Sequence, residues 1–364
     1  MTLDLDGVLG LRLAAQHLVG PPLRSVVDAV GHSLAVQSQD MPLARFSLGL
    51  RTGLADVAVL EGLASGAVVR THVLRPTWHW VLATDLRWLL ALTGAKTLSG
   101  VASRHRTLGI DEAAVDTALG VLTRALAGTH LTRKELAPLL VAASHPRRHE
   151  AVTHLLLVAE SLGLICSGTP RPDGEHTYAL LDEVVPPGPD LDRAEAVRRL
   201  VDRFVAGHGP TSVKDLMRWA KLTKTEASGA LAESGHETAI VDGVQVWFAP
   251  TARVPAADSP RSWLLPTFDE VFLSHDAPRF PRVTGHPWDT QHLNPAEAGG
   301  GVVVVDRRDV GVFKRRLQRG RLSVEVWLGS GARPGDGDGA RAASGRLGKH
   351  LGLEAEVTVH SARP

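Results

Sequence analysis

The chain has 364 residues, of which 44% are hydrophobic and 22% are charged, a composition typical of a globular protein with roughly two to four domains. Because 40 Lys and Arg residues are balanced by 39 Asp and Glu residues, the net charge of +1 gives no general sign of a polyanionic partner. A single cysteine excludes an internal disulfide, and no membrane-spanning run or signal-peptide start is present, so we expect a cytoplasmic protein without membrane contact.

The first part of the chain, residues 1–109, is predicted to hold helices followed by a pair of strands. Apolar residues recur at helical spacing and predict helices near residues 8–18, 23–32, 42–50 and 54–63. β-Branched and aromatic residues then dominate residues 68–81, which predicts two strands. Helices followed by a strand pair are typical of a winged helix, a helix-turn-helix with a small sheet appended.

A short polar motif, Gln37-Ser38-Gln39, lies between two of these helices. In an extended backbone Gln37 and Gln39 would share one face, while Ser38 points away. Two neighbouring primary amides can hold a water molecule in one orientation and can place carbonyl dipoles against a developing positive charge. A polar loop whose amides bond to the backbone is the alternative interpretation.

The residues around the motif resemble a known family, the bacterial winged-helix DNA glycosylases of the AlkZ and YcaQ type, which remove N7-alkylated guanine and unhook interstrand crosslinks. The likeness runs from Gln37 through Asp40 to Arg51. It is closest to AlkZ-type members, whose catalytic motif is glutamine, any apolar residue, glutamine. Ser38 departs from that pattern, which should matter little if its side chain points away from the site. YcaQ-type members carry aspartate where this chain has Gln39.

The segment from Arg75 to His79 adds to the likeness, and an acidic residue, Asp85, opens the helix that follows. A hydrogen-bonded structural histidine is the favoured interpretation of His79, and a place in the active-site cleft is the alternative. The resemblance implies a catalytic pair, with further residues that line the site. The pair is Gln37 and Gln39, and the lining candidates are Asp40, Arg51 and His79.

Residues 110–188 and 189–255 each repeat the order of three helices and a strand hairpin. Capping boxes at Thr132 and Thr223 begin helices, and an Asp242-Gly243 turn marks the second hairpin. Together with the looser first unit, these stretches predict three tandem winged-helix units.

Three features of the second unit have specific interpretations. Cys166 closes an apolar run, which favours a buried structural thiol over a nucleophile. His149 and His154 are five residues apart, off one helical face, so we expect no metal site there. Arg147 and Arg148 form a basic helix start and are candidates for DNA contact.

Residues 256–364 change to short strands, expected at 302–305, 310–313 and 322–328 as a small antiparallel β subdomain. Residues 264–279 again resemble the family, with a packing role as the default interpretation. The glycine-rich stretch 329–348 is expected to be a mobile loop.

The densest group of cations also lies in this last part, and we name it the basic cluster. Its candidate DNA contacts are Arg307, Arg308, Lys314, Arg315, Arg316, Arg319 and Arg321. Contact with DNA phosphates, or insertion of a hairpin into a groove, is the functional interpretation, since family members are thought to use such a hairpin against the minor groove. A strand edge kept soluble by its charge is the alternative.

These observations predict an α+β fold, mostly α, with three winged-helix units and a β subdomain, and the resemblance implies that these parts form a C shape around duplex DNA. The resemblance implies a monofunctional glycosylase for N7-alkylguanine and N7-linked crosslinks of the azinomycin type, in self-resistance or DNA repair. We expect a nucleoid-associated monomer without cofactor or metal.

Two other functions compete with this hypothesis. A winged-helix transcription regulator would bind DNA without chemistry, but it should show recognition helices dense in base-reading side chains. The helix that follows Thr223 offers chiefly Lys224, Thr225 and Glu226. A non-catalytic lesion-binding protein is the other option. Because a crosslinked base cannot swing out of the duplex, the family resemblance also predicts glutamines on an open surface and not in a closed base pocket.

Overall fold

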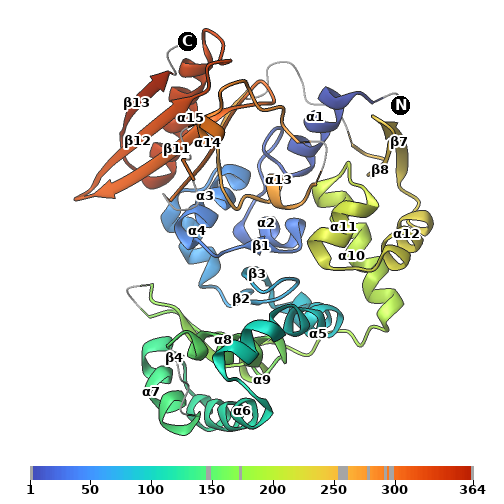
Figure 1. Ribbon diagram of the computed structural model, residues 1–364, viewed down its shortest axis with the longest axis vertical. Coiled ribbons are helices and arrows are strands. Elements are labelled where there is room, and N and C mark those ends of the chain that lie inside the picture. The colour runs from blue at the N-terminus through green and yellow to red at the C-terminus, as the bar shows by residue number, and fades with distance from the viewer. Residues whose placement is uncertain are drawn as a thin grey trace.

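The computed structural model describes residues 3–144, 149–171, 174–252, 261–276, 279–290, 293–294 and 299–361. In Figure 1 the first unit lies at the centre, the second below it, the third to the right, and a C-terminal sheet to the upper left. Helices and strands both contribute, and helices predominate, as the sequence predicts. Within the described part of the chain, no helix is both long and apolar enough to cross a membrane.

The first unit combines short helices with a three-stranded sheet. Its elements are α1 (Leu5–Ala15), α2 (Val26–Ser33), β1 (Val36–Gln37), α3 (Met41–Thr52), α4 (Asp56–Leu63), β2 (Val68–His72) and β3 (Trp78–Leu82). Strand β3 lies between β1 and β2, and both pairings are antiparallel. Ser25 and Asp40 accept hydrogen bonds from backbone N–H groups and thereby cap α2 and α3. Val30, Leu48 and Trp80 share the core that joins these helices to the sheet.

The second unit repeats this order after the long helix α5 (Ala83–Leu108). Its elements are α6 (Glu112–Leu126), β4 (Leu131–Thr132), α7 (Arg133–Ser144), α8 (His149–Ser161), β5 (Ile165–Ser167), β6 (Thr177–Leu180) and α9 (Leu181–Val184). The strands form a sheet in the order β4-β6-β5. Leu122, Leu136 and Leu155 bring the three helices into one core. Strands β5 and β6 pair antiparallel, so the hairpin that the sequence predicts in this unit is confirmed.

The third unit has the same order with one strand reduced to a bridge. Its elements are α10 (Arg193–His208), α11 (Val213–Ala220), α12 (Lys224–Glu233), β7 (Glu237–Val241) and β8 (Val244–Phe248). Thr211 pairs with Trp247 by backbone hydrogen bonds at the place where the other units have their first strand. Asp242 and Gly243 both have positive φ, 49° and 77°, as the two central residues of a type I′ hairpin turn require.

A five-stranded sheet completes the fold, in the order β13-β12-β11-β10-β9. Its strands are β9 (Ser262–Pro266), β10 (Gly300–Val305), β11 (Arg308–Gln318), β12 (Arg321–Leu328) and β13 (Ala355–Ser361), and two short helices, α13 (Glu270–Leu273) and α14 (Pro287–Thr290), lie between β9 and β10 in the chain. The three predicted strands, β10, β11 and β12, pair antiparallel as expected, but the subdomain as a whole is mixed, because β13 pairs with β12 in parallel. A parallel neighbour needs a crossover connection, and the chain supplies one in the helix that precedes β13.

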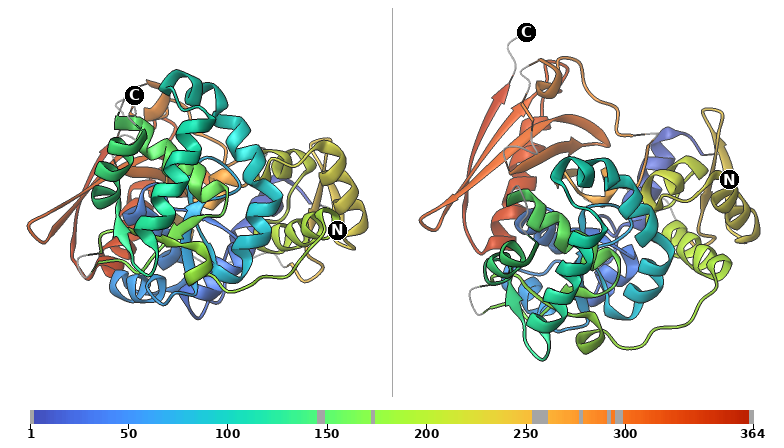
Figure 2. Two further views of the ribbon diagram at one scale, coloured as in Figure 1. Left: turned by 90° about the horizontal axis from the view of Figure 1, so that it is seen from below. Right: turned by 60° about the horizontal axis from the view of Figure 1, so that its bottom comes forward.

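That crossover is α15 (Asp336–Leu351), so the prediction of a mobile loop over residues 329–348 is wrong. Ala340, Ala343 and Leu347 recur at helical spacing and are buried against the sheet. A side chain at Gly339 would meet Val305 at 3.1 Å, so the small residue lets the helix approach closely. Figure 2 shows α15, in red, against one face of the sheet.

The same helix attaches the sheet to the first unit. His350 lies 2.9 Å from the carbonyl oxygen of Leu54 through Nδ1, and 3.3 Å from a carboxylate oxygen of Asp56 through Nε2. A Cβ at Gly49 would lie 2.3 Å from the His350 ring, so α3 meets this ring at a glycine. These contacts fix the sheet against α3, the helix that follows the glutamine motif.

Candidate active site

The glutamine motif lies where the edge strand β1 turns into α3. Gln37 pairs with His79 of β3, and Ser38 donates its backbone N–H to Trp78. The strand ends at Gln37 and the chain bends at Gln39, so the motif is not extended throughout. Gln37 is 6% exposed, whereas Gln39 is exposed and makes no hydrogen bond with the described residues. One amide is thus held inside the protein and the other is open to a ligand.

The buried amide, Gln37, is oriented by a neighbouring cation. Its Oε1 lies 3.5 Å from Nη2 of Arg75, at the long limit for a hydrogen bond. Arg75 also donates to the carbonyl of Trp219 at 2.8 Å and to Nε2 of His79 at 2.9 Å. His79 donates from Nδ1 to Thr77, and burial holds its pKa well below the ordinary value, so the ring is neutral. His79 is therefore a buried, hydrogen-bonded neighbour that supports Arg75.

Glu270 completes this group and was missed at the sequence level. One carboxylate oxygen accepts the backbone N–H of Gln37 at 3.0 Å, and the other accepts Nε1 of Trp219 at 3.0 Å. Burial raises the pKa of Glu270, while the charge of Arg75 works against that shift. The family likeness of residues 264–279 was the signal that could have drawn attention to it.

Arg51 lies beneath the motif and not at its surface. It is 2% exposed and forms a bidentate pair with Asp269, with nitrogen–oxygen distances of 2.8 and 3.0 Å. Ser47 donates to the same carboxylate at 2.6 Å. Burial alone would raise the pKa of Asp269, but the charge and hydrogen bonds of Arg51 hold it below its usual range. The pair joins α3 to Asp269, which caps α13 immediately before Glu270, and so fixes the carboxylate that accepts the Gln37 N–H.

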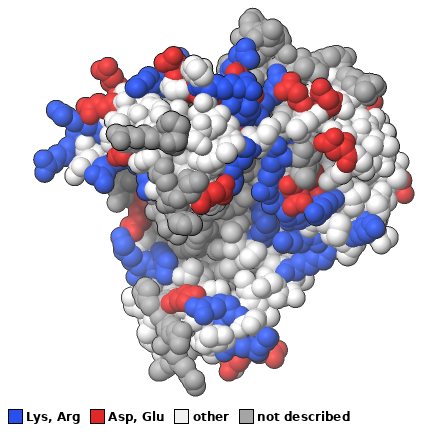
Figure 3. Space-filling view, turned by 45° about the horizontal axis from the view of Figure 1, so that its top comes forward, with Lys and Arg blue, Asp and Glu red and all other residues white. Residues whose placement is uncertain are grey.

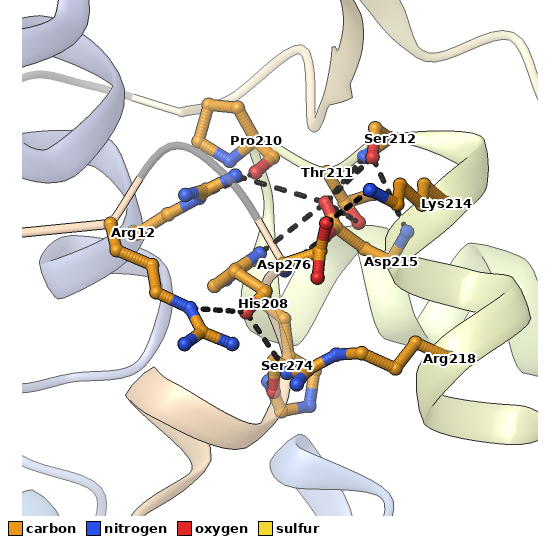
Figure 4. A network of polar contacts seen from close by, with 12 residues as sticks. Arg12, His208, Pro210, Thr211, Ser212, Lys214, Asp215, Arg218, Ser274 and Asp276 are labelled. Carbon is orange, nitrogen blue, oxygen red and sulfur yellow. Dashed lines mark hydrogen bonds and ion pairs between the residues drawn. The ribbon is translucent and has the colours of Figure 1, made fainter.

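A second buried network, shown in Figure 4, joins the third unit to α1 and to the segment around α13. Arg12 of α1 donates to the carbonyl of Pro210, and Asp215 of α11 accepts the backbone N–H of Asp276 at 2.6 Å. Arg218 donates to three backbone carbonyls between residues 272 and 275. The segment that carries Glu270 is therefore held from two sides.

Asp40 has a capping role, and its charge interacts with one member of the basic cluster, Arg315. Its side chain accepts the backbone N–H of Leu43 at 3.1 Å, which begins α3 immediately after Gln39. Burial lowers the pKa of Arg315 on β11, and the charges of Asp40 and Asp56 partly oppose that shift. Arg315 is thus the member of the basic cluster whose charge interacts with the motif region.

The rest of the basic cluster divides between two ends of β11. At the β11–β12 turn, Arg316, Arg319 and Arg321 are exposed. Lys314 lies over the ring of Trp327, 5.5 Å from its centroid. This end, which we name the hairpin tip (residues 316–321), presents cations to solvent.

At the other end of β11 the cations are already paired with carboxylates of the same chain. Arg308 pairs with the buried carboxylate of Asp336 at 2.8 Å, and Arg307 pairs with Asp6 of α1. The structure therefore does not bring Arg307 and Arg308 together with the hairpin tip. Two further candidates, Arg147 and Arg148, lie outside the described residues.

Figure 3 shows a hollow in one face of the molecule, with Lys and Arg side chains along its border. No group of three or more possible metal ligands gathers within the part of the chain that the structure describes. Taken together, the candidate site offers the exposed amide of Gln39, the fixed amide of Gln37 and cations at the protein surface.

Comparison with known proteins gives a family and a structural relative. The model of the family described as DNA glycosylase AlkZ-like matches residues 30–352. Among solved structures, the chain is similar to the Streptomyces sahachiroi DNA glycosylase AlkZ, with a TM-score of 0.73 and 20% sequence identity. That match covers 99% of this chain and 100% of the other. A comparison with curated proteins gives no match.

Proposed function

The chain belongs to the AlkZ-like DNA glycosylase family, and from this premise we propose that it hydrolyses the N-glycosidic bond of N7-alkylguanine in duplex DNA. We extend the proposal to N7-linked interstrand crosslinks of the azinomycin type. The observation that carries it is the paired placement of a fixed Gln37 and an exposed Gln39 at the end of β1. Family membership favours an enzyme over a winged-helix transcription regulator.

The chemistry of the substrate agrees with neutral side chains. Alkylation at N7 leaves guanine cationic, so the base is a good leaving group without a strong acid. What remains is to stabilise an oxocarbenium-like sugar and to aim a water molecule at its anomeric carbon. Amide carbonyls can do both, although an amide is too weak a base to deprotonate water before attack.

The two glutamines divide this work according to their environments. Gln39, exposed and without a hydrogen bond to the described residues, contacts the sugar and places its carbonyl dipole near the developing charge. Gln37 holds the water, because its position is fixed by Glu270 and Arg75. Glu270 and Arg75 act as positioning residues. The motif contains no lysine, which favours hydrolysis without a Schiff-base intermediate.

DNA binding follows from the exposed cations. We propose that the hairpin tip contacts the phosphate backbone and enters the minor groove, with Arg316, Arg319 and Arg321 exposed for that purpose. The three units that share one element order act as winged helices and, with the sheet, curve around one side of the duplex. Exposure of Gln39 supports an open site of this kind.

Base release from defined duplexes tests the proposal. One duplex carries a small N7-methylguanine and the other an N7-linked interstrand crosslink, and both are incubated with the wild-type chain. We expect release from both. Release of the small base with complete exclusion of the crosslink would contradict the open site, and release from neither would contradict the N7-alkylguanine assignment.

A further inference from the structure

A cavity lies between the sheet of the first unit and the start of α7. It has a volume of about 420 Å³, within the range of roughly 300–1,000 Å³ that small-molecule sites occupy. Arg70 and Trp78 contribute from the first unit, and Arg133, Lys134 and His176 contribute from the second. The cavity is thus formed by two units of the fold.

The charges that line this cavity favour an anion. Its cations are Arg70, Arg133 and Lys134, and its carboxylate, Glu175, pairs with Lys134 at 2.7 Å. In the described ranges, no carboxylate lies within ion-pair distance of Arg70 or Arg133. Arg70 is only 8% exposed, and burial of its charge is costly and lowers its pKa; the charge of Glu160 only partly opposes that shift. An anionic ligand would offset that cost.

The rings in the same cavity favour a planar group. Trp78 is partly exposed, and the guanidinium of Arg70 lies over its ring at 4.5 Å from the centroid. Burial lowers the pKa of His176 to about 3, so this ring is neutral at pH 7. Aromatic rings combined with arginine are the usual platform for a nucleobase, because every base has a π face.

We propose that this cavity binds a nucleotide, with the phosphate at Arg70, Arg133 and Lys134 and the base against Trp78 and His176. The ligand is either a free nucleotide or one nucleotide of a DNA strand. The site is separate from base excision and does not depend on the proposed reaction. It is nevertheless linked to the motif, because Arg70 donates to both the hydroxyl and the carbonyl oxygen of Ser38.

Titration calorimetry with dGMP tests the site, using the full chain without damaged DNA. Deoxyguanosine and inorganic phosphate are titrated separately, to measure the base and the anion alone. The test variant is Arg133→Ala combined with Lys134→Ala, and the matched control is Arg124→Ala, an exposed arginine on α6. Melting temperatures of both variants show whether they are folded.

We expect dGMP to bind at least about tenfold more tightly than either fragment, and the double variant to weaken dGMP by at least about tenfold. Arg124→Ala should bind dGMP like the wild type. A DNA trinucleotide that displaces dGMP identifies a strand as the source, and failure to displace it identifies a free nucleotide. Three results would overturn the site: no dGMP binding at millimolar concentration, phosphate binding as tightly as dGMP, or equal weakening in Arg124→Ala. Loss of base excision affects none of these outcomes.

Discussion

Charged side chains are buried and paired around Gln37, whereas they are exposed at the hairpin tip. Around Gln37, Arg51 and Asp269 are paired with almost no exposure to solvent. At the hairpin tip, Arg316 and Arg319 are exposed at the end of a long strand. Buried pairs fix geometry to the accuracy that chemistry on a sugar needs, whereas exposed cations attract phosphate over a range of positions. The contrast predicts that damage to the first region changes stability and rate, and damage to the second changes affinity.

The largest effect is expected from Asp269→Ala. This change leaves Arg51 buried without its anion, and breaking such a pair typically costs about 3–5 kcal/mol of unfolding free energy. The matched control is Asp289→Ala, which removes one of the two carboxylates that pair with the half-exposed Arg282, leaves Asp309 in place and should cost at most about 1 kcal/mol. Urea unfolding measures both. Equal small losses would show that the buried pair does not hold the region together.

The second effect concerns the rate of excision. Gln39→Ala and Gln37→Ala should each reduce release of N7-methylguanine by about 10²–10³, as expected when one transition-state dipole is removed. Both variants keep the backbone N–H of residue 37 that Glu270 accepts, so melting temperature and DNA affinity should change little.

The control for these variants is Gln245→Ala, the same chemical change at an exposed position on β8. It should release N7-methylguanine at the wild-type rate. Wild-type rates in both motif variants would remove the glutamines from the mechanism.

The third effect concerns affinity for DNA. Alanine at Arg316, Arg319 and Arg321 together should weaken binding to damaged and undamaged duplex alike, because interactions with phosphates carry no sequence information. The slope of log affinity against log salt should fall by about 0.9 for each phosphate that the variant no longer neutralises. Arg307→Ala should change little, since that side chain already pairs with Asp6. An unchanged salt slope in the triple variant would favour the alternative interpretation, in which the cations of the hairpin tip only keep a strand edge soluble.

Local signals predicted much of the fold. The apolar spacing of residues 42–50 and the turn residues Asp242 and Gly243 are signals that act within a few positions, so the sequence alone locates α3 and the β7–β8 turn. The glycine-rich α15 was missed because its stability comes from packing on the sheet and not from helix propensity.

The candidate site was only partly predictable for a related reason. Glu270 lies 233 positions from Gln37 in the chain, and no spacing rule connects them. The burial of Gln37 beside an exposed Gln39 depends on where β1 ends, and helix and strand periodicity do not fix that point. The separation of Arg308 from the hairpin tip follows from the length of β11, which places them at opposite ends.

The smallest effect on excision is expected from Ser38→Ala. This variant tests whether the Ser38 side chain, which contacts Arg70, contributes to stability and not to catalysis. Ser38 is fully buried, and its hydroxyl accepts from Nε of Arg70 at 3.2 Å. Alanine removes this acceptor but keeps the carbonyl oxygen that Nη2 of Arg70 contacts at 3.1 Å. We therefore expect a decrease of about 1–3 kcal/mol in unfolding free energy, the cost of an unsatisfied buried donor, with excision within about threefold of the wild type. If Ser38→Ala instead reduced excision to the extent of Gln39→Ala while remaining folded, Ser38 would belong to the catalytic face, and the division between the two sides of the motif would be wrong.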